Sequence, residues 1–403
     1  MNKIPHLDKI SNENILNQNC IIINPIQVFE RKKNTKYDEE EISNLAQNIN
    51  LIVKYQKNII IRKITPSLFF GKGQVQNFKI YLKKYSSNLL LINSQISPIQ
   101  QRNLELSLHC KVLDRTGLIL EIFGERAVTK HGKLQVDLAT LSYQKSRLVR
   151  SWTHLERQRG GYGFMGGPGE RQIESDKRQI NKRISKIKNE LKKIESNKLI
   201  QRRNRNKSSK PFISLVGYTN AGKSSIFNYL TKENVYAKNQ LFATLDTTMR
   251  KCSLLSYNNH LILSDTVGFI TNLPTELVIS FKTTLDEIHF SDYLLHVIDI
   301  SNPEWEAQKK TVEKILETIL GDKFDRSKII EIWNKSDLLN KEDLIYFTNV
   351  SKRCKDTILF SSKLKQGKEE LLNLISKKLK KNKKFILFNF TTPTYSKKIK
   401  TLL

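Results

Sequence analysis

The sequence predicts an α/β protein made of three folded parts in series. Short apolar runs alternate with helical patterns over residues 1–130, which is typical of a small α/β domain with a mostly parallel sheet. Residues 131–207 carry heptad-like apolar spacing interrupted by glycines, which predicts an antiparallel helical hairpin and a basic linker. Residues 208–382 open with a G-x-x-x-x-G-K-S motif between a strand pattern and a helix pattern. This context predicts a P-loop domain with a mostly parallel, six-stranded sheet, followed by a short tail at 383–403.

The N-terminal part contains three apolar runs that read as strands and two helical patterns. The runs lie at 20–24, 58–61 and 88–93. Helices are expected over 39–53 and after Ser97. The run Gly71-Lys72-Gly73 has two interpretations, because it could be a phosphate-binding loop but lacks the full fingerprint. A tight turn before a helix explains it at least as well.

Two apolar stripes with coiled-coil spacing predict the hairpin. The first stripe is Leu134, Leu138, Leu141, Leu148, Trp152 and Leu155, and the second is Ile180, Ile184, Ile187, Leu191 and Ile194. Residues 157–172 between them are rich in glycine and contain Pro168, so we expect them to leave the helix. The hairpin is therefore predicted to end in a flexible, basic tip.

The tip combines cations with aromatic rings. Its residues of interest are Arg147, Arg150, Arg157, Arg159, Arg171, Trp152, Tyr162 and Phe164. Cations suit phosphates and rings suit stacked bases, so this composition favours RNA contact. The alternative for the tip is a mobile loop whose arginines are only solvated. The alternative for Trp152 is a place in the apolar seam between the two helices. The polar, basic stretch 201–210 reads as a linker that can also touch phosphate.

The net charge and the positions of the cysteines indicate which partners and sites to expect. The chain has 403 residues, with 69 Lys and Arg against 39 Asp and Glu, a formal net charge of +30. This excess favours an RNA-rich partner over a membrane, although a solvated lysine-rich surface or AT-rich coding also produces it. Cys20, Cys110, Cys252 and Cys354 are too scattered for a zinc site or a disulfide framework. Without an apolar leader or a run of about 18 apolar residues, we expect a cytoplasmic monomer with at most peripheral membrane association.

The glycine-rich motif at Gly217–Ser224 predicts a phosphate site. Its glycines at 217 and 222 let backbone N–H groups wrap a phosphate chain. Lys223 can place a positive charge on the β and γ oxygens, and the Ser224 hydroxyl can bind magnesium.

Three further motifs follow at predicted strand ends. Asp265–Gly268 is a D-x-x-G, where a magnesium-linked aspartate and a glycine amide that senses the γ-phosphate are expected. Asn334–Asp337 is an N-K-x-D, whose last carboxylate can accept hydrogen bonds from N1–H and N2–H of guanine. Adenine offers no such pair of donors, so the motif predicts GTP rather than ATP. Ser361–Lys363 is suited to offering a backbone amide to guanine O6.

Longer stretches resemble one GTPase family. These are LDRTGLILEIF at 113–123, SRLVRSWTHLERQRGG at 146–161, GPGERQIESDKR at 167–178, LFATLDTT at 241–248 and DTVGFI at 265–270. They are similar to HflX, the ribosome-associated GTPases of the Obg-HflX group, over about residues 20–382. The resemblance implies GTP hydrolysis, and binding to the large ribosomal subunit and its rRNA with the tip near the peptidyl-transferase region. It also implies splitting of stalled ribosomes, notably under stress.

The family's site maps onto matching positions of this chain. It implies that residues 242–246 are switch I and that Thr244 is a second Mg²⁺ ligand beside Ser224. It also implies that Lys223, Thr244 and Gly268 act in catalysis. The expected nucleotide contacts are Gly217, Tyr218, Thr219, Asn220, Ala221, Gly222, Lys223, Ser224, Phe242, Ala243, Thr244, Leu245, Asp246, Asp265, Thr266, Val267, Gly268, Asn334, Lys335, Ser336, Asp337, Ser361, Ser362 and Lys363.

Some positions depart from the family pattern. Phe269 stands where small GTPases place a water-orienting glutamine, which predicts slow intrinsic hydrolysis and activation on the ribosome. Thr247 replaces a proline after switch I, and Met165 and Gly166 replace an arginine before the GPGE stretch. Only about 20 residues follow the last predicted helix, where related bacteria often carry a longer subdomain.

Two alternative functions remain open at this point. One is a ribosome-assembly GTPase of the Obg or Era kind, which the hairpin and N-terminal domain argue against. The other is an RNA-binding or RNA-remodelling protein with a vestigial or ATP-driven nucleotide site. Lys223, Ser224, Asp265 and Asp337 oppose the second.

Overall fold

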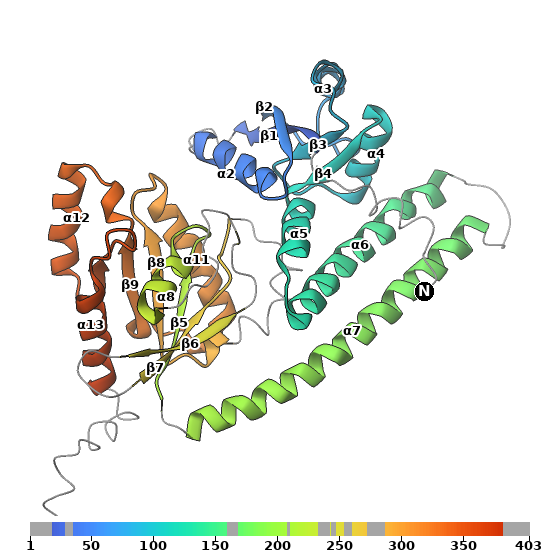
Figure 1. Cartoon of the computed structure of the whole chain (residues 1–403). Coiled ribbons are helices and arrows are strands. Elements are labelled where there is room, and N and C mark those ends of the chain that lie inside the picture. Colours follow the sequence, from blue (N-terminus) through green and yellow to red (C-terminus); the bar gives the residue numbers. More distant parts are fainter. Residues whose placement is uncertain are drawn as a thin grey trace, which may run out of the picture. The chain divides into compact units, whose positions relative to one another are not determined.

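The chain divides into two compact units, which are described separately (Figure 1). The computed structural model describes residues 18–28, 35–158, 168–207, 210–232, 242, 247–253, 260–271 and 287–381. Unit 1 covers the described residues up to Lys192, and unit 2 covers those from Lys193 onward.

Unit 1 contains a four-stranded parallel sheet in the order β2-β1-β3-β4. The strands are β1 (Asn19–Gln27), β2 (Ile52–Ile61), β3 (Leu89–Ile92) and β4 (Lys111–Asp114). The three predicted strands are confirmed, whereas β4 was not predicted because only two of its four residues, Val112 and Leu113, are apolar. The expected helix over 39–53 is wrong at its end. Helix α2 (Thr35–Gln47) stops earlier, and Ile52 and Val53 pair with β1, as suits β-branched side chains.

Helices cover both faces of this sheet (Figure 1). Helices α3 (Lys72–Lys84) and α4 (Pro98–Leu108) pack on one face through a core that includes Phe78, Leu104 and Ile23. Helix α5 (Arg115–Arg126) contacts α2 on the other face. Gly71 precedes α3 as its N-cap residue with φ −69°, which agrees with the turn interpretation of this stretch.

The two long helices of the middle region are α6 (Lys130–Gln158) and α7 (Pro168–Lys207). They run in opposite directions, as predicted (Figure 1). Residues 159–167, with Arg159, Tyr162 and Phe164, lie outside the described residues, as do the side chains at 149–173. The tip is shorter than predicted, because α7 already begins at Pro168, where a fixed φ and a missing N–H favour the first helical turn.

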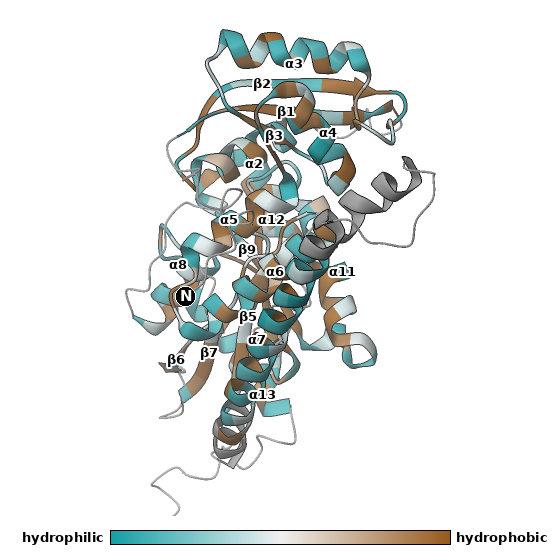
Figure 2. Ribbon diagram, turned by 90° about the vertical axis from the view of Figure 1, so that its right-hand side faces the viewer, coloured by the Kyte–Doolittle hydropathy of each residue, from teal (hydrophilic) through white to brown (hydrophobic). Residues whose placement is uncertain are grey.

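The predicted stripe of α7 is buried or half-buried along its length, with Ile180 and Leu191 the most enclosed. In α6 Leu138 is buried and Leu134, Leu141 and Leu148 are half-buried. The other sides of α7 are exposed and largely hydrophilic (Figure 2). The predicted stripes are therefore the more enclosed sides of both helices, and the expectation that they pack on each other stays a prediction.

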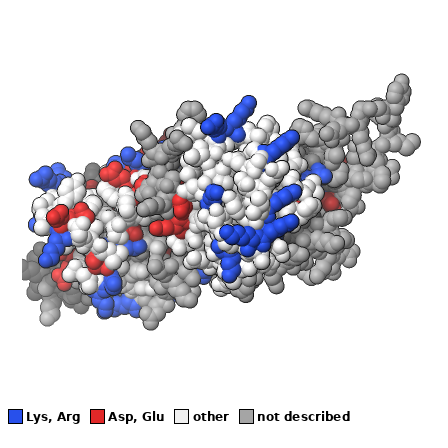
Figure 3. All heavy atoms as spheres, turned by 90° about the horizontal axis from the view of Figure 1, so that it is seen from above, with Lys and Arg blue, Asp and Glu red and all other residues white. Residues whose placement is uncertain are grey.

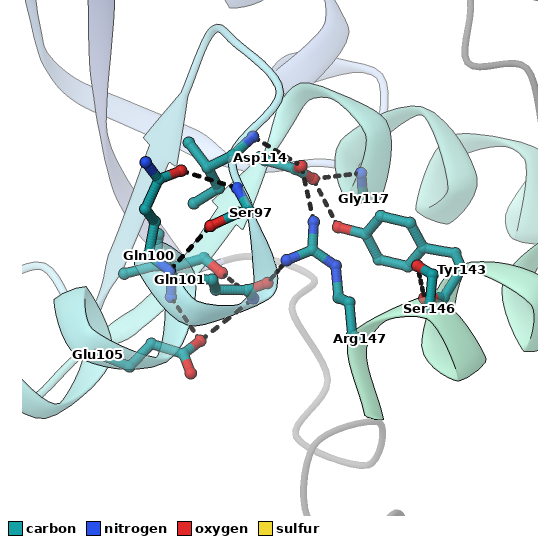
Figure 4. A network of polar contacts seen from close by, with 11 residues as sticks. Ser97, Gln100, Gln101, Glu105, Asp114, Gly117, Tyr143, Ser146 and Arg147 are labelled. Carbon is teal, nitrogen blue, oxygen red and sulfur yellow. Dashed lines mark hydrogen bonds and ion pairs between the residues drawn. The ribbon is translucent and has the colours of Figure 1, made fainter. Parts of the chain in front are cut away.

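Arg147 does not serve as the free cation that its place near the tip suggested. Its guanidinium donates to Asp114 Oδ2 at 2.7 Å and to Gln101 Oε1, and its Cζ lies 4.1 Å from the centre of the Tyr143 ring. The Tyr143 hydroxyl donates to Asp114 Oδ1 at 2.6 Å (Figure 4). These contacts hold α6 against the end of β4. The interpretation of Arg147 as an RNA contact is therefore wrong, and its role is to attach α6 to the sheet of unit 1.

Unit 2 contains a six-stranded sheet in the order β10-β9-β8-β5-β7-β6, in which only the β6–β7 pair is antiparallel. The strands are β5 (Phe212–Gly217), β6 (Thr248–Ser253), β7 (His260–Asp265), β8 (Tyr293–Asp299), β9 (Ile329–Asn334) and β10 (Thr357–Leu359). The helices are α8 (Lys223–Thr231), α11 (Trp305–Leu320), α12 (Lys341–Arg353) and α13 (Lys368–Lys381), with short 3-10 turns at Gly321–Lys323, Arg326–Lys328 and Ser336–Leu338. This confirms the predicted mostly parallel sheet. The sequence also carries a helical pattern over 275–288, and most of this range lies outside the described residues.

Candidate nucleotide-binding site

The glycine-rich loop joins the end of β5 to the start of α8, at the carboxyl edge of the sheet where ligands of α/β proteins bind. Two of its glycines have no room for a side chain. At Gly217, φ is +154° and a Cβ would overlap the carbonyl oxygen of Val297 on β8. At Gly222, φ is +95° and a Cβ would overlap Asn334 Nδ2. The loop therefore requires glycine at both positions for steric reasons.

Lys223 lies inside this loop. Its Nζ donates to Tyr218 O at 2.7 Å and to Gly217 O at 3.2 Å, and the residue is 6% exposed. Burial lowers the pKa of Lys223 to about 8, against the opposing effect of the Asp265 carboxylate. The loop thus encloses a cationic group with its ammonium held among backbone carbonyls.

Ser224 and Asp265 meet although 41 residues separate them in the chain. The Ser224 hydroxyl donates to Asp265 Oδ2 at 2.6 Å. Asp265 ends β7 and is fully buried, and the next residue, Thr266, donates from Oγ1 to Leu215 O on β5 at 2.6 Å. A Cβ on Gly268 would lie 2.8 Å from Thr219 Cγ2, so the D-x-x-G turn packs directly against the loop.

Backbone hydrogen bonds link the loop to the residue after the D-x-x-G. Phe269 N donates to Gly217 O at 3.1 Å, and Thr219 N donates to Phe269 O at 2.8 Å. The Phe269 ring is 1% exposed, and the Tyr218 hydroxyl lies 2.7 Å from Thr271 Oγ1. Sequence reasoning missed this pairing, since nothing in either motif indicates a bridge between them.

Asn334 joins the predicted guanine motif to the glycine-rich loop. Its Nδ2 donates to Ala221 O at 2.8 Å, and its Oδ1 accepts from Ser362 N at 3.3 Å. Asp337 Oδ1 accepts from the Ser361 hydroxyl at 2.6 Å. Three predicted motifs therefore meet at one edge of the sheet.

Lys335 has a partner that the motifs did not indicate. Its Nζ lies 2.7 Å from Asp299 Oδ2, and Asp299 is the last residue of β8. Lys335 has φ +64°, in the left-handed region. A carboxylate between two isoleucines, inside a largely apolar run, was the available signal for Asp299.

The expected switch I falls mostly outside the described residues. Phe242 is described and is 2% exposed, with φ +57°. Ala243, Thr244, Leu245 and Asp246 are not described. In the part of the chain that the structure does describe, no group of three or more His, Cys, Asp or Glu could hold a metal ion.

Comparisons with known proteins identify the family. Family models match residues 36–124 (GTP-binding GTPase N-terminal), 126–205 (GTP-binding GTPase Middle Region) and 212–335 (50S ribosome-binding GTPase). The GTPase HflX of Magnetococcus marinus is 45% identical over 334 residues, covering 83% of this chain and 76% of the relative. The chain belongs to the HflX GTPase family. Escherichia coli HflX is also 45% identical, over 68% of this chain and 63% of the relative.

A solved structure supports the same conclusion for the fold. The crystal structure of SsGBP with GDP matches with a TM-score of 0.50 and 26% identity, covering 89% of this chain and 98% of SsGBP. As an HflX GTPase with a P-loop domain, the protein binds GTP and hydrolyses it to GDP and phosphate. None of the described helices is long and apolar enough to cross a membrane.

Proposed function

We propose that this HflX GTPase is a cytoplasmic monomer that binds the large ribosomal subunit and its rRNA, and splits stalled ribosomes under stress. The match of residues 212–335 to a model of 50S ribosome-binding GTPases carries this proposal. The net charge of +30 supports it, because a polyanionic particle gains affinity by counterion release. GTP favours the bound state through the two switch loops, and hydrolysis releases them.

The meeting of the motifs supports the roles that we assign to the nucleotide contacts. Gly217–Ser224 holds the phosphates, Asp265–Gly268 senses the γ-phosphate, and Lys223, Thr244 and Gly268 stabilise the transferred group. Asn334–Asp337 and Ser361–Lys363 bind guanine, with the Asp337 carboxylate as the acceptor for N1–H and N2–H.

Mg²⁺ fits the oxygen donors beside the loop. The Ser224 hydroxyl lies 2.6 Å from the Asp265 carboxylate, and hydroxyl and carboxylate oxygens are the donors that Mg²⁺ prefers. Ser224 and Thr244 would hold the ion, and Asp265 would orient the Ser224 hydroxyl by accepting its hydrogen bond. When bound, Mg²⁺ neutralises charge on the β and γ oxygens.

Base specificity tests the guanine assignment. Asp337→Asn exchanges an acceptor for a donor, so the affinity for GTP should fall about 100-fold or more while that for xanthosine triphosphate rises. Competition with a fluorescent GDP analogue measures both, with ATP as the non-binding control. A variant that retained full GTP affinity would remove Asp337 from the base site.

The ribosome assignment has a direct test. Ribosomes mixed with the protein and a non-hydrolysable GTP analogue are separated by sedimentation, with GDP as the control. We expect the protein in the large-subunit fraction and a loss of intact 70S particles only with the analogue. Intact particles without bound protein would reject the ribosomal role and leave the GTPase activity standing.

A further inference from the structure

Unit 1 carries a second basic surface, far along the chain from the tip. Residues 51–104 contain nine Lys or Arg and no Asp or Glu. The cations are Lys54, Lys57, Arg62, Lys63, Lys72, Lys79, Lys83, Lys84 and Arg102, and all are exposed. Most lie on or beside helix α3 and strand β2, and we call this surface the α3 face. Figure 3 views unit 1 from the side on which α3 lies and shows Lys and Arg side chains spread over it.

Helix α3 presents its cations in a line. Val75, Phe78 and Leu82 are buried against the sheet. Lys72, Gln76, Lys79 and Lys83 are exposed and follow the i, i+4, i+7, i+11 spacing of a single helical face. At 1.5 Å per residue this line is about 16 Å long, which matches a stretch of phosphate backbone rather than a single phosphate group.

Aromatic rings lie beside these cations. The rings of Tyr55 and Tyr85 are stacked, with centroids 4.8 Å apart and an interplanar angle of 15°, and the Tyr81 ring lies 4.9 Å from Tyr55. All three are half-buried, so each presents part of its surface to solvent. Lys57 Nζ donates to the Tyr81 hydroxyl at 2.7 Å, and this hydrogen bond lowers the pKa of Tyr81. Lys84 lies 5.4 Å from the centre of the Tyr85 ring.

We propose that the α3 face binds RNA, with the lysines of α3 on phosphates and Tyr81 and Tyr85 against bases. The absence of carboxylates from residues 51–104 leaves nothing on this stretch to repel a polyanion. Rings beside cations are the combination that single-stranded and looped RNA requires. An anionic membrane fits less well, because the described part of α3 exposes one large apolar side chain, Ile80. The others exposed between residues 51 and 104, which are Ile52, Ile60 and Ile64, lie on or just after β2 and form no apolar helix face.

This inference deepens the proposed ribosomal function by naming a second RNA contact. It does not depend on GTP, because the α3 face belongs to unit 1 and the nucleotide motifs belong to unit 2. The two proposals can therefore fail separately.

The charge contribution is tested with Lys79→Gln/Lys83→Gln in the full chain. The matched control is Lys310→Gln/Lys314→Gln, which removes two exposed lysines at the same spacing from α11 in unit 2. Binding of a fluorescein-labelled RNA hairpin is measured by anisotropy at several KCl concentrations. The slope of log K against log salt should flatten by about 1.4 in the first variant, at about 0.7 for each lost phosphate contact, and stay unchanged in the control. Equal slopes in both variants would overturn the proposal.

The ring contribution is tested with Tyr85→Leu, with Tyr346→Leu on α12 as the matched control. Tyr346 is 61% exposed and lies in unit 2. Loss of one stacked base should weaken RNA binding about 5- to 150-fold without changing the salt slope. Melting curves verify that each variant is folded.

Two further outcomes separate the possible partners. If the lysine variant bound RNA normally but lost binding to phosphatidylglycerol vesicles, the α3 face would be a membrane surface and the RNA proposal would be wrong. If wild-type protein failed to sediment with ribosomes while the RNA slopes changed as expected, the inference would stand and the ribosomal role would fail.

Discussion

At the residue scale, one buried amide holds the nucleotide motifs together. Asn334 is fully buried and bonds to both Ala221 and Ser362, so it fixes the phosphate loop and the base loop with a single side chain. Gly222 is confined because Asn334 Nδ2 occupies the space where its Cβ would lie. The glycine is needed for this contact as well as for the phosphates.

Gly222→Ala should therefore abolish tight nucleotide binding. A Cβ there would displace Asn334 and force alanine to a φ near +95°, which costs about 1–3 kcal/mol in the strained backbone alone. Binding of a fluorescent GDP analogue and the melting temperature report the two effects. The control is Gly124→Ala in α5, where a Cβ meets nothing within 4 Å, and helix propensity should stabilise that variant slightly. Unchanged nucleotide affinity in Gly222→Ala would contradict this account of the loop.

The motif residues could be identified from the sequence alone, because each motif is a short run of fixed spacing that follows a predicted strand. It could not identify Asp299 as the partner of Lys335, or the bridge from Phe269 to Gly217, because both depend on which strands are neighbours. Arg147 was misread for the same reason. Its carboxylate partner lies 33 residues earlier, at the end of a strand with only two apolar residues, which the sequence pattern did not reveal.

At the element scale, helix α6 is attached to the unit 1 sheet through charge. Asp114 is fully buried as a side chain and accepts from Arg147, Tyr143 and the backbone of Gly117. Burial raises the pKa of Tyr143, which keeps its hydroxyl protonated as a donor. Helix α6 is thereby held against the end of β4 at Tyr143 and Arg147.

Arg147→Ala should destabilise unit 1 by about 3 kcal/mol, because it leaves the Asp114 carboxylate buried without its cation. Tyr143→Phe should cost about 1 kcal/mol, the value of one hydrogen bond. Urea unfolding and hydrogen exchange along α6 provide the measurement, with Lys145→Ala on the same helix as the control. A stable Arg147→Ala variant that bound RNA more weakly would restore Arg147 as an RNA contact.

Strand β8 contains a buried histidine that should make unit 2 sensitive to acid. His296 is 1% exposed and sits between Val216 of β5 and Glu331 of β9 in the sheet. Burial, with smaller contributions from the nearby cations Lys309, Lys223 and Arg326, lowers the pKa of His296 to about 3. In the unfolded chain this imidazole takes up a proton near pH 6.5, whereas the folded unit resists protonation.

The unfolding free energy of unit 2 should thus fall as the pH drops below about 6.5, by up to about 1.4 kcal/mol per pH unit from this group. His296→Leu should flatten the dependence. Urea titrations at pH 7, 6 and 5 can follow the fluorescence of Trp305 and Trp333, whose rings lie 6.0 Å apart in unit 2. A Trp152→Phe background silences the third tryptophan. Parallel pH curves for the two proteins would show that His296 does not carry the effect.

At the scale of the whole molecule, periodicity predicted the order of the parts and the class of each sheet. Periodicity predicted the ends of elements less well where the same apolar residues fit both a helix and a strand. The apolar residues at 52 and 53 continue the helical pattern of α2, but pairing with β1 makes them a strand. The middle of α7 was predicted from its apolar stripe at 180–194, but residues 201–207, which were expected to be a linker, continue the helix. The sequence also did not show that α7 contributes residues to both compact units.

Helix α7 passes from unit 1 into unit 2 at Lys193. We therefore expect an unbroken α7 to be needed for coupling between ribosome binding and GTP hydrolysis, but not for nucleotide binding. Lys193→Pro removes a backbone donor and breaks the helix at an exposed position, at a cost of about 3 kcal/mol. GDP affinity should stay within about twofold of wild type, since the residues that we assign to the nucleotide site all lie in unit 2. Stimulation of GTP hydrolysis by large ribosomal subunits should fall about fivefold or more, the usual size of coupling between sites. Lys193→Ala keeps the helix and should retain full stimulation. Full stimulation in the proline variant as well would mean that the ribosome activates unit 2 without a continuous α7.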